Sequence, residues 1–351
     1  MSARQALARR VRLLHVLALA GGAVGFALLL DRIGWTTMRG AVVGAGWWFL
    51  WIALIDVAAT ACDATGVYCF VRAEARVSFW RVFAAQASGL AINRLTPGNS
   101  LGEAVKVTML VDDVPHATAV SAIVKFNVAT WYVALVVIVA GVPVTLLGLD
   151  LPGRVEWAVW IGTAGMVGLG VVLALLLRRG ALATVIGAVR RLGLVSRERA
   201  ARWTARIVAI DASIKAFGNP WSRRGVACIA GSRLLHFAAT VAVLRAAAVP
   251  MTVPIVAGML SVGIIVLWVS NVVPLGLGLA DGSNYILYGA LGSSPLAGVA
   301  FTMVNRTRTC VLAGIGLAVM AIASFAKRAR PAVDGGSDRA SESRTPVTAT
   351  S

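Results

Sequence analysis

The amino-acid sequence predicts an all-α polytopic membrane protein, with about six full transmembrane helices and two re-entrant broken-helix hairpins in an inverted repeat. Two observations predict the membrane class. Of the 351 residues, 58% are hydrophobic and 14% are charged, whereas a soluble domain carries roughly 25% charge. Several apolar runs also reach the length of about 20 residues that crosses a bilayer. The hairpins are predicted by a third observation, because proline and glycine interrupt two apolar segments.

The distribution of charge indicates membrane topology. The net charge is +18, and the cations cluster beside the ends of apolar runs, as the positive-inside rule requires. This placement favours contact with anionic lipid over binding of nucleic acid. The four cysteines show no CxxC spacing, so we expect them to pack in the interior and to bind no metal.

The N-terminal segment predicts an uncleaved first span. Residues 1–12 are basic and precede an apolar run from Leu13 to Leu30. A cleavable signal peptide is the alternative, but the run lacks a small-x-small cleavage site and further spans follow it. Residues 31–40 are expected to form a short outer loop before a second span at 41–62.

Two carboxylates lie in or beside the second span. Asp56 and Asp63 are seven residues apart and therefore share a helix face near the expected inner end. A carboxylate inside a membrane is a functional candidate, although Asp63 could instead lie at the interface. Trp47, Trp48 and Trp51 are expected to form an aromatic belt at one interface.

The first broken segment follows a basic loop at 72–81, which we place in the cytoplasm. Residues 82–95 are too short to cross, Pro97 and Gly98 break the helix, and residues 101–111 form a second short helix. Two half-length helices around a break predict a hairpin that enters and leaves on the cytoplasmic side. Broken backbone is tolerated at membrane depth only where it is buried in protein or lines a wet cavity.

The centre of the chain is expected to cross outward at 117–147 and back at 157–177. Residues 178–224 then form the most basic segment of the chain. Their apolar residues recur at helical spacing, which predicts an amphipathic helix on the anionic cytoplasmic leaflet. Recruitment of a partner enzyme is the alternative role of this segment.

The last third of the chain repeats this arrangement. Residues 225–248 cross outward and carry Arg233 and His236, which lie three apart on one face. A second hairpin follows, in which helices at 255–273 and 285–291 flank the second motif. The final span at 296–325 then returns to the cytoplasm.

The predicted domain organisation is simple. A cytoplasmic N-terminus at 1–12 precedes a transmembrane domain at 13–330, and the tail at 331–351 is polar and expected to be disordered. The first repeat covers about 82–147 and the second about 252–325. Six crossings and two hairpins place both termini and every arginine-rich segment in the cytoplasm, and the two hairpins then open to opposite sides. If both hairpins crossed fully, this charge assignment would largely survive.

The two breaks predict a binding site near the bilayer midplane. Broken helices present free backbone N–H groups and positive dipole ends, and nearby cations suit a phosphate. Glu103 and Asp281 could neutralise these cations or carry a coupling proton. The structural alternative is a buried pair, of the kind Glu103 and Lys125 could form, that only fixes helix packing. The candidate binding residues are Arg94, Pro97, Gly98, Asn99, Gly102, Glu103, Lys106, Lys125, Arg233, Asn271, Pro274, Gly276, Gly278, Asp281, Asn305, Arg306 and Arg308.

Catalytic motifs are lacking in the sequence. The three histidines are scattered, and no HExxH, GxSxG or GxxxxGK[ST] pattern occurs. We therefore expect a protein that is not an enzyme and that holds no cofactor or metal.

At its two broken motifs the chain resembles the lysylphosphatidylglycerol synthase transmembrane-region family, which is flippase-like. The resemblance covers about residues 10–325. Asp281 stands where this family usually has glutamate, and Lys125 stands where it often has arginine. The residues that carry the resemblance are Arg94-Leu95-Thr96-Pro97-Gly98, Gly102-Glu103 and Lys125 in the first copy, and Pro274-Leu275-Gly276-Leu277-Gly278, Asp281 and Arg306 in the second.

The resemblance implies an inner-membrane protein of a bacterium or archaeon that moves or presents lipids across the bilayer. In this family an aminoacyl-transferring domain can follow the membrane region, whereas here a short polar tail follows it. We therefore expect the standalone membrane form, which would not synthesise lysyl-lipid by itself.

Two functional hypotheses remain at this point. The first is a lipid flippase or transporter for an envelope lipid with a polar, anionic headgroup. The alternative is a membrane-embedded lipid-modifying enzyme, with Glu103 or Asp281 as base, or a membrane scaffold for a lipid or sugar transferase. The expected partners are membrane lipids, a lipid-modifying or glycosyl-transferring enzyme and a second copy of the chain, without nucleic acid.

Overall fold

A computed structural model describes the bundle that positions the predicted site. It covers residues 34–96, 101–149, 151–179, 219–246, 249, 251–270 and 279–329, with scattered positions between 20 and 31. The regular elements of this described part are all helices: α2 (Trp35–Ala45), α3 (Trp47–Arg72), α4 (Phe79–Leu95), α5 (Leu101–Leu110), α6 (His116–Gly148), α7 (Gly153–Arg179), α10 (Pro220–Ala246), α11 (Val253–Ser270), α12 (Leu279–Ala290) and α13 (Pro295–Ala329).

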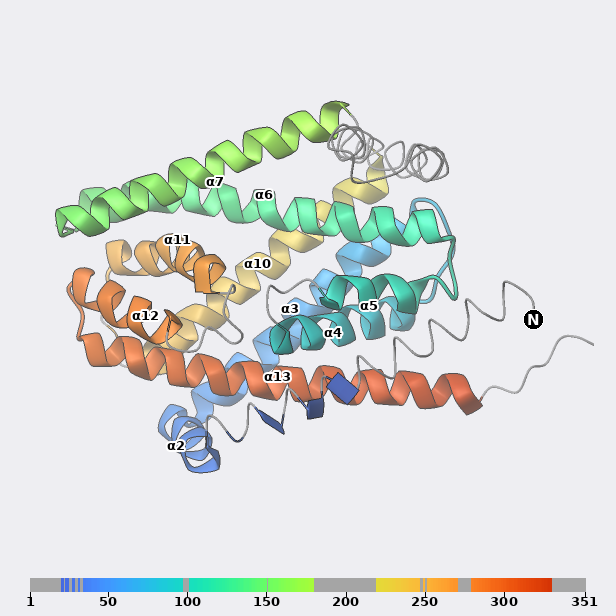
Figure 1. The fold of residues 1–351 in the computed structure, drawn as a ribbon, viewed down its shortest axis with the longest axis horizontal. Helices are drawn as coiled ribbons and strands as arrows, with labels where there is room; N and C mark the ends of the chain where they lie inside the picture. The colour runs from blue at the N-terminus through green and yellow to red at the C-terminus, as the bar shows by residue number, and fades with distance from the viewer. Residues whose placement is uncertain are drawn as a thin grey trace, which may run out of the picture.

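Five helices of the described part, α3, α6, α7, α10 and α13, are long and apolar enough to cross a membrane. α6, α7 and α13 run along the long axis of the bundle, and α3 and α10 cross it obliquely (Figure 1). The prediction of an all-α polytopic membrane protein is therefore confirmed. These helices correspond to five of the six expected crossings, and most of the sixth, at 13–30, lies outside the described residues.

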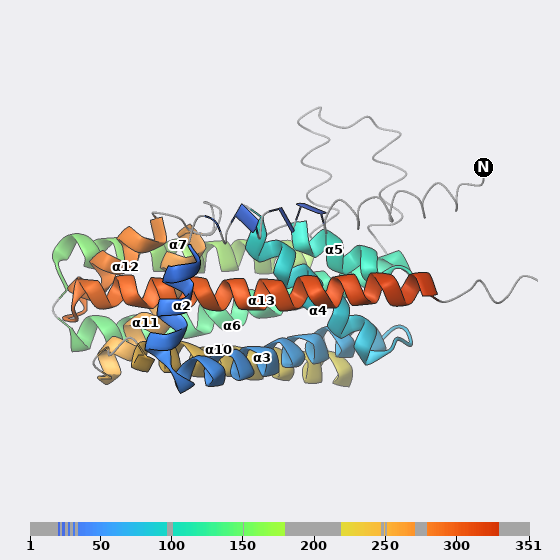
Figure 2. The same ribbon diagram turned by 90° about the horizontal axis from the view of Figure 1, so that it is seen from below.

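The boundaries of the second span differ from the prediction. The span was expected at 41–62, after an outer loop at 31–40, but α3 runs to Arg72 and α2 begins at Trp35. Gly46 separates the two helices with a φ of +54°, a left-handed conformation that only glycine adopts readily. The chain changes direction there, so α2 lies across α13 and the start of α3 (Figure 2).

The helices around the first break form a hairpin. α4 and α5 pack against each other and both lead back to the same end of the bundle (Figure 1). A methyl group at Gly102 would overlap the carbonyl oxygen of Gly89, and one at Gly89 would overlap Lys106. The missing side chains therefore allow the two backbones to touch, as small residues do between membrane helices.

The second pair of short helices mirrors the first. α11 and α12 extend from the opposite end of the bundle, so the end of α11 and the start of α12 face the end of α4 and the start of α5 (Figure 1). α4 packs on α13, and α11 packs on α6. Each hairpin thus contacts the long helix that follows the other hairpin, which is the reciprocal arrangement expected of two inverted units.

The helices that precede the hairpins extend this relationship. α3 and α10 make the most extensive helix contact of the described part and run in opposite directions. The four helices α3 to α6 therefore correspond to α10 to α13, a larger unit than the expected repeats at 82–147 and 252–325. Gly66 and Gly225 lie at the α3–α10 contact, where a methyl group at either would be crowded.

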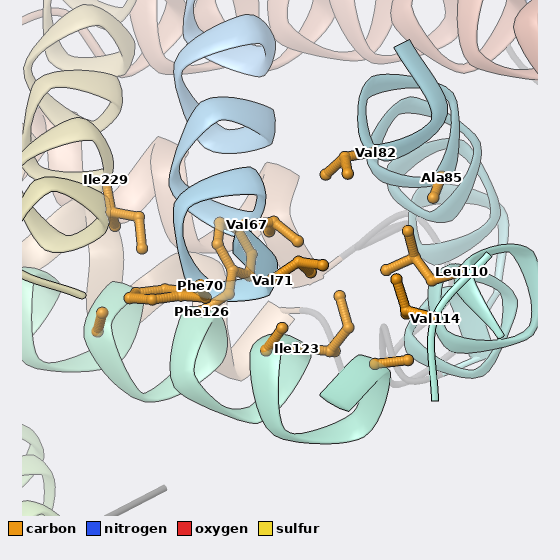
Figure 3. Packing of buried hydrophobic residues seen from close by; sticks show 13 residues of the cluster. Val67, Phe70, Val71, Val82, Ala85, Leu110, Val114, Ile123, Phe126 and Ile229 are labelled. Carbon is orange, nitrogen blue, oxygen red and sulfur yellow. The ribbon is translucent and has the colours of Figure 1, made fainter. Parts of the chain in front are cut away.

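An apolar cluster anchors the first hairpin. Phe70 of α3 and Phe126 of α6 lie together at its centre, with Val82 of α4 and Leu110 of α5 beside them. These side chains turn toward one another from four helices (Figure 3). The cluster holds the start of α4 and the end of α5 against α3 and α6, so packing fixes the base of the first hairpin.

Basic residues gather at one end of the bundle, where α3, α7 and α13 finish and α4 and α10 begin. We term this the basic end. The sequence places Arg72, Arg76, Arg81, Arg178, Arg179, Arg223, Arg224, Lys327 and Arg328 there, whereas the opposite end has Arg39, Arg154 and Arg245. Most of the predicted amphipathic segment at 178–224, the N-terminus at 1–12 and the tail at 331–351 lie outside the described residues.

The contact between Gly89 and Gly102 predicts that Gly102→Ala destabilises the protein. The added methyl must separate α4 from α5, and overpacking of this kind costs roughly 1–3 kcal/mol. Thermal unfolding in detergent, followed by circular dichroism, should show a lower melting temperature. Gly165→Ala on α7 is the matched control, because nothing lies within 4 Å of its added methyl. Equal melting temperatures for the two variants would contradict the close contact.

Candidate functional site

A cavity of about 490 Å³ lies between helices of the two hairpins. Its wall includes the ends of α4 and α11, which lie beside the breaks, and Asn284 in the middle of α12. α3, α6, α10 and α13 supply the rest of the lining. Both inverted units therefore contribute to one central cavity.

Four arginines line this cavity: Arg94, Arg233, Arg306 and Arg308. Arg94 comes from the tip of the first hairpin, Arg233 from the middle of α10, and the other two from α13. Two aspartates, Asp56 and Asp63, contact members of this group. Positive charge is therefore in excess among the described side chains of the site.

Arg308 binds Asp56 through two charge-assisted hydrogen bonds. Its Nε and Nη2 atoms donate to the two carboxylate oxygens of Asp56, and its Nη1 donates to Asn305 Oδ1 at 3.3 Å. Nδ1 of His236 lies 3.3 Å from Asp56 Oδ1. Asp56 is thus shared between α13 and α10, although it belongs to α3.

A second buried ion pair joins α3 to α10. Nη2 of Arg233 donates to both oxygens of Asp63, at 2.9 and 2.7 Å. The Asp63 side chain is 2% exposed, so it is buried between the two helices. The hydroxyl of the neighbouring Ser232 donates to the carbonyl oxygen of Ala59, one turn before Asp63, at 3.0 Å. These bonds fix Arg233 beside the cavity.

Glu103 forms a separate polar cluster behind the tip of the first hairpin. Its carboxylate accepts hydrogen bonds from Asn93 at 2.8 Å, Lys106 at 2.8 Å and Asn127 at 2.9 Å. Asn93 also accepts a bond of 2.7 Å from the backbone N–H of Gly102. Because Asn93 lines the cavity, it connects this cluster to the site.

Lys106 and Lys125 lie outside the cavity lining. Lys106 pairs with Glu103 and stands 5.0 Å from the centre of the Phe126 ring. Lys125 is fully buried, and its Nζ atom contacts Glu74 at 3.1 Å. The pairing suggested between Glu103 and Lys125 is therefore wrong, and the two lysines fix helices near the cavity.

The structure thus brings five predicted residues to the cavity wall: Arg94, Arg233, Asn305, Arg306 and Arg308. Gly102 and Glu103 support the tip of the first hairpin from behind. Outside the described residues lie Pro97, Gly98, Asn99, Asn271, Pro274, Gly276 and Gly278, together with the side chain of Asp281.

Several polar residues of the site were not among the candidates. Asn93 precedes Glu103 by ten residues, and Asn271 precedes Asp281 by the same interval, a repeated spacing that could have marked Asn93. Asn284 lies at the cavity and donates to Thr302 Oγ1 at 2.9 Å. No pattern in the sequence indicated the contact between Asp56 and Arg308, because 252 positions separate the two residues.

Comparison with known proteins identifies a family whose model matches this chain. The family model for the lysylphosphatidylglycerol synthase TM region matches residues 15–316. The match includes all lining residues of the cavity and links the chain to lipid-related membrane function. Searches of curated proteins and of solved structures return no match.

The pair of Asp63 and Arg233 predicts strong energetic coupling. Asp63→Asn or Arg233→Gln alone leaves an uncompensated charge in the bundle and should lower the free energy of unfolding by up to about 3 kcal/mol. The double variant should lose much less than the sum of the two single losses. Unfolding in mixed micelles, followed by circular dichroism, measures this cycle.

The control cycle uses Arg81 and Asp113 at the basic end. These groups are 3.7 Å apart with side chains 33% and 31% exposed, so their coupling should stay below about 1 kcal/mol. Additive losses at Asp63 and Arg233 would show that the buried pair does not hold α3 to α10.

Proposed function

The chain belongs to the lysylphosphatidylglycerol synthase TM region family, and on that basis we propose that it is a lipid flippase or transporter for an envelope lipid with a polar, anionic headgroup. The lipid tails remain in the bilayer while the headgroup occupies the central cavity. The observation that carries this proposal is the set of four arginines around the cavity.

The lining suits a phosphate-bearing headgroup. Arginine binds phosphate through paired N–H groups, and charge at membrane depth is costly enough that it marks functional sites. A volume of about 490 Å³ lies in the range of roughly 300–1,000 Å³ found for small-ligand sites. A headgroup therefore fits the cavity in both size and charge.

The proposed orientation follows from the basic end. Positive residues stay in the cytoplasm, so the basic end faces inward in a plasma (inner) membrane and both termini are cytoplasmic. The first hairpin then enters the bilayer from the cytoplasm and the second from outside. Inverted broken helices that meet at a midplane site are the architecture used for alternating access, which supports transport.

The alternative is a membrane-embedded lipid-modifying enzyme or a scaffold for a transferase. Three donors hold the Glu103 carboxylate between α4, α5 and α6, which suits a structural role better than that of a base. The basic end could dock an acidic partner enzyme. Lipid products formed by the purified chain from supplied donors would favour the enzyme over the transporter.

Transport predicts that Arg306→Gln and Arg94→Gln slow lipid movement. Proteoliposomes with a fluorescent phosphatidylglycerol in one leaflet measure translocation by chemical quenching of the exposed dye. Loss of one charged hydrogen-bond donor costs roughly 1.5–3 kcal/mol, so the rate should fall by about tenfold or more.

Arg154→Gln is the matched control, because Arg154 is exposed at the start of α7, away from the cavity. Its rate should equal that of the wild type, and a zwitterionic probe should move more slowly than the anionic one. Equal rates for all variants, or for empty liposomes, would exclude headgroup binding at these arginines as the basis of transport.

A further inference from the structure

We propose that Asp56, Arg308 and His236 form a proton site linked to anion binding, so that one proton is taken up with each anionic headgroup. This inference rests on the proposed function and names the ion that the site couples to lipid. The three residues come from α3, α13 and α10, so a change in their pairing would affect both inverted units.

Asp56 is hidden behind the two residues that contact it. Its side chain is 0% exposed, whereas those of Arg308 and His236 are 12% and 22% exposed. Both Arg308 and His236 line the cavity. An anion in the cavity therefore meets the guanidinium and the imidazole first, and reaches Asp56 only by competing for them.

Arg308 cannot serve both anions fully. Its Nε and Nη2 atoms are occupied by Asp56 and its Nη1 by Asn305. Other N–H groups of the guanidinium remain for a phosphate, but the single positive charge of Arg308 cannot neutralise two anions, so a bound phosphate weakens its pairing with Asp56. Because a buried carboxylate without a cationic partner is strongly destabilising, Asp56 then needs a replacement.

His236 can provide that replacement. Its Nδ1 atom faces Asp56 at 3.3 Å and serves as the donor, which leaves Nε2 to accept a proton. Protonation at Nε2 converts the ring to an imidazolium that pairs with Asp56. The headgroup adds one negative charge and the proton adds one positive charge, so the net charge of the site stays constant.

The surrounding charges favour this linkage. Asp63 on α3 and Arg233 on α10 face the same site, as do Arg94 on α4 and Arg306 on α13. α11 carries no titratable group. A bound anion adds negative charge beside His236 and so favours the protonated imidazole.

Isothermal titration calorimetry measures the proton directly. The full chain in phosphatidylcholine nanodiscs is titrated with dihexanoyl phosphatidylglycerol, a phosphodiester whose charge is constant between pH 6 and pH 8. Buffers with different ionisation enthalpies report proton uptake, which should be about one per lipid bound, because one imidazole nitrogen is available. The Kd should rise with pH, by up to about tenfold per unit.

His236→Asn retains a donor toward Asp56 but does not titrate, so it should bind the probe without proton uptake and with a Kd independent of pH. His116→Asn is the control, because His116 is exposed at the start of α6, and it should match the wild type. Wild-type binding without proton uptake, or uptake that persists in His236→Asn, overturns this inference and leaves the transport proposal standing. No binding of the probe at any pH would overturn both.

Discussion

The constraint on which the structure depends is that buried charge must be paired. Arg308 and Asp56 are 252 positions apart in the chain and meet inside a bundle built of apolar helices. Neither group is stable there alone, so the pair fixes how α13 lies against α3. Arg233 and Asp63 do the same for α10 and α3. The charges that surround the cavity therefore also join the two inverted units, and binding and architecture share the same residues.

Close backbone contact is the second requirement. Inside a membrane the apolar effect does not drive one helix against another, so association relies on tight packing and on polar bonds. Glycine supplies the packing at the two contacts that matter most for the site, Gly66 with Gly225 between α3 and α10, and Gly89 with Gly102 inside the first hairpin. The second contact brings the backbone N–H of Gly102 to Asn93, so it also orients the polar cluster behind the cavity.

The sequence predicted those features that depend on local composition. Apolar length identified the spans, and proline with glycine identified both breaks. The ion-pair partners could not be predicted from the sequence. Glu103 pairs with Lys106, three residues away on its own helix, and Lys125 pairs with Glu74, just beyond the end of α3. By sequence alone either lysine could have paired with Glu103, because the position of Lys125 depends on how α6 packs against its neighbours. The helix boundary at Gly46 was missed because its positive φ has no strong signal in an apolar run.

The two repeats carry unlike chemistry, and this difference locates the substrate site. In the sequence, Lys106 stands three residues after Glu103, whereas Asn284 stands three residues after Asp281. The first hairpin therefore neutralises its own acid, and α12 has no cation of its own. α13 places Arg306 and Arg308 at the cavity, whereas its counterpart α6 directs Lys125 toward Glu74. An inverted pair of scaffolds thus forms one asymmetric anion site, with its positive charge concentrated on α10, α13 and the tip of the first hairpin.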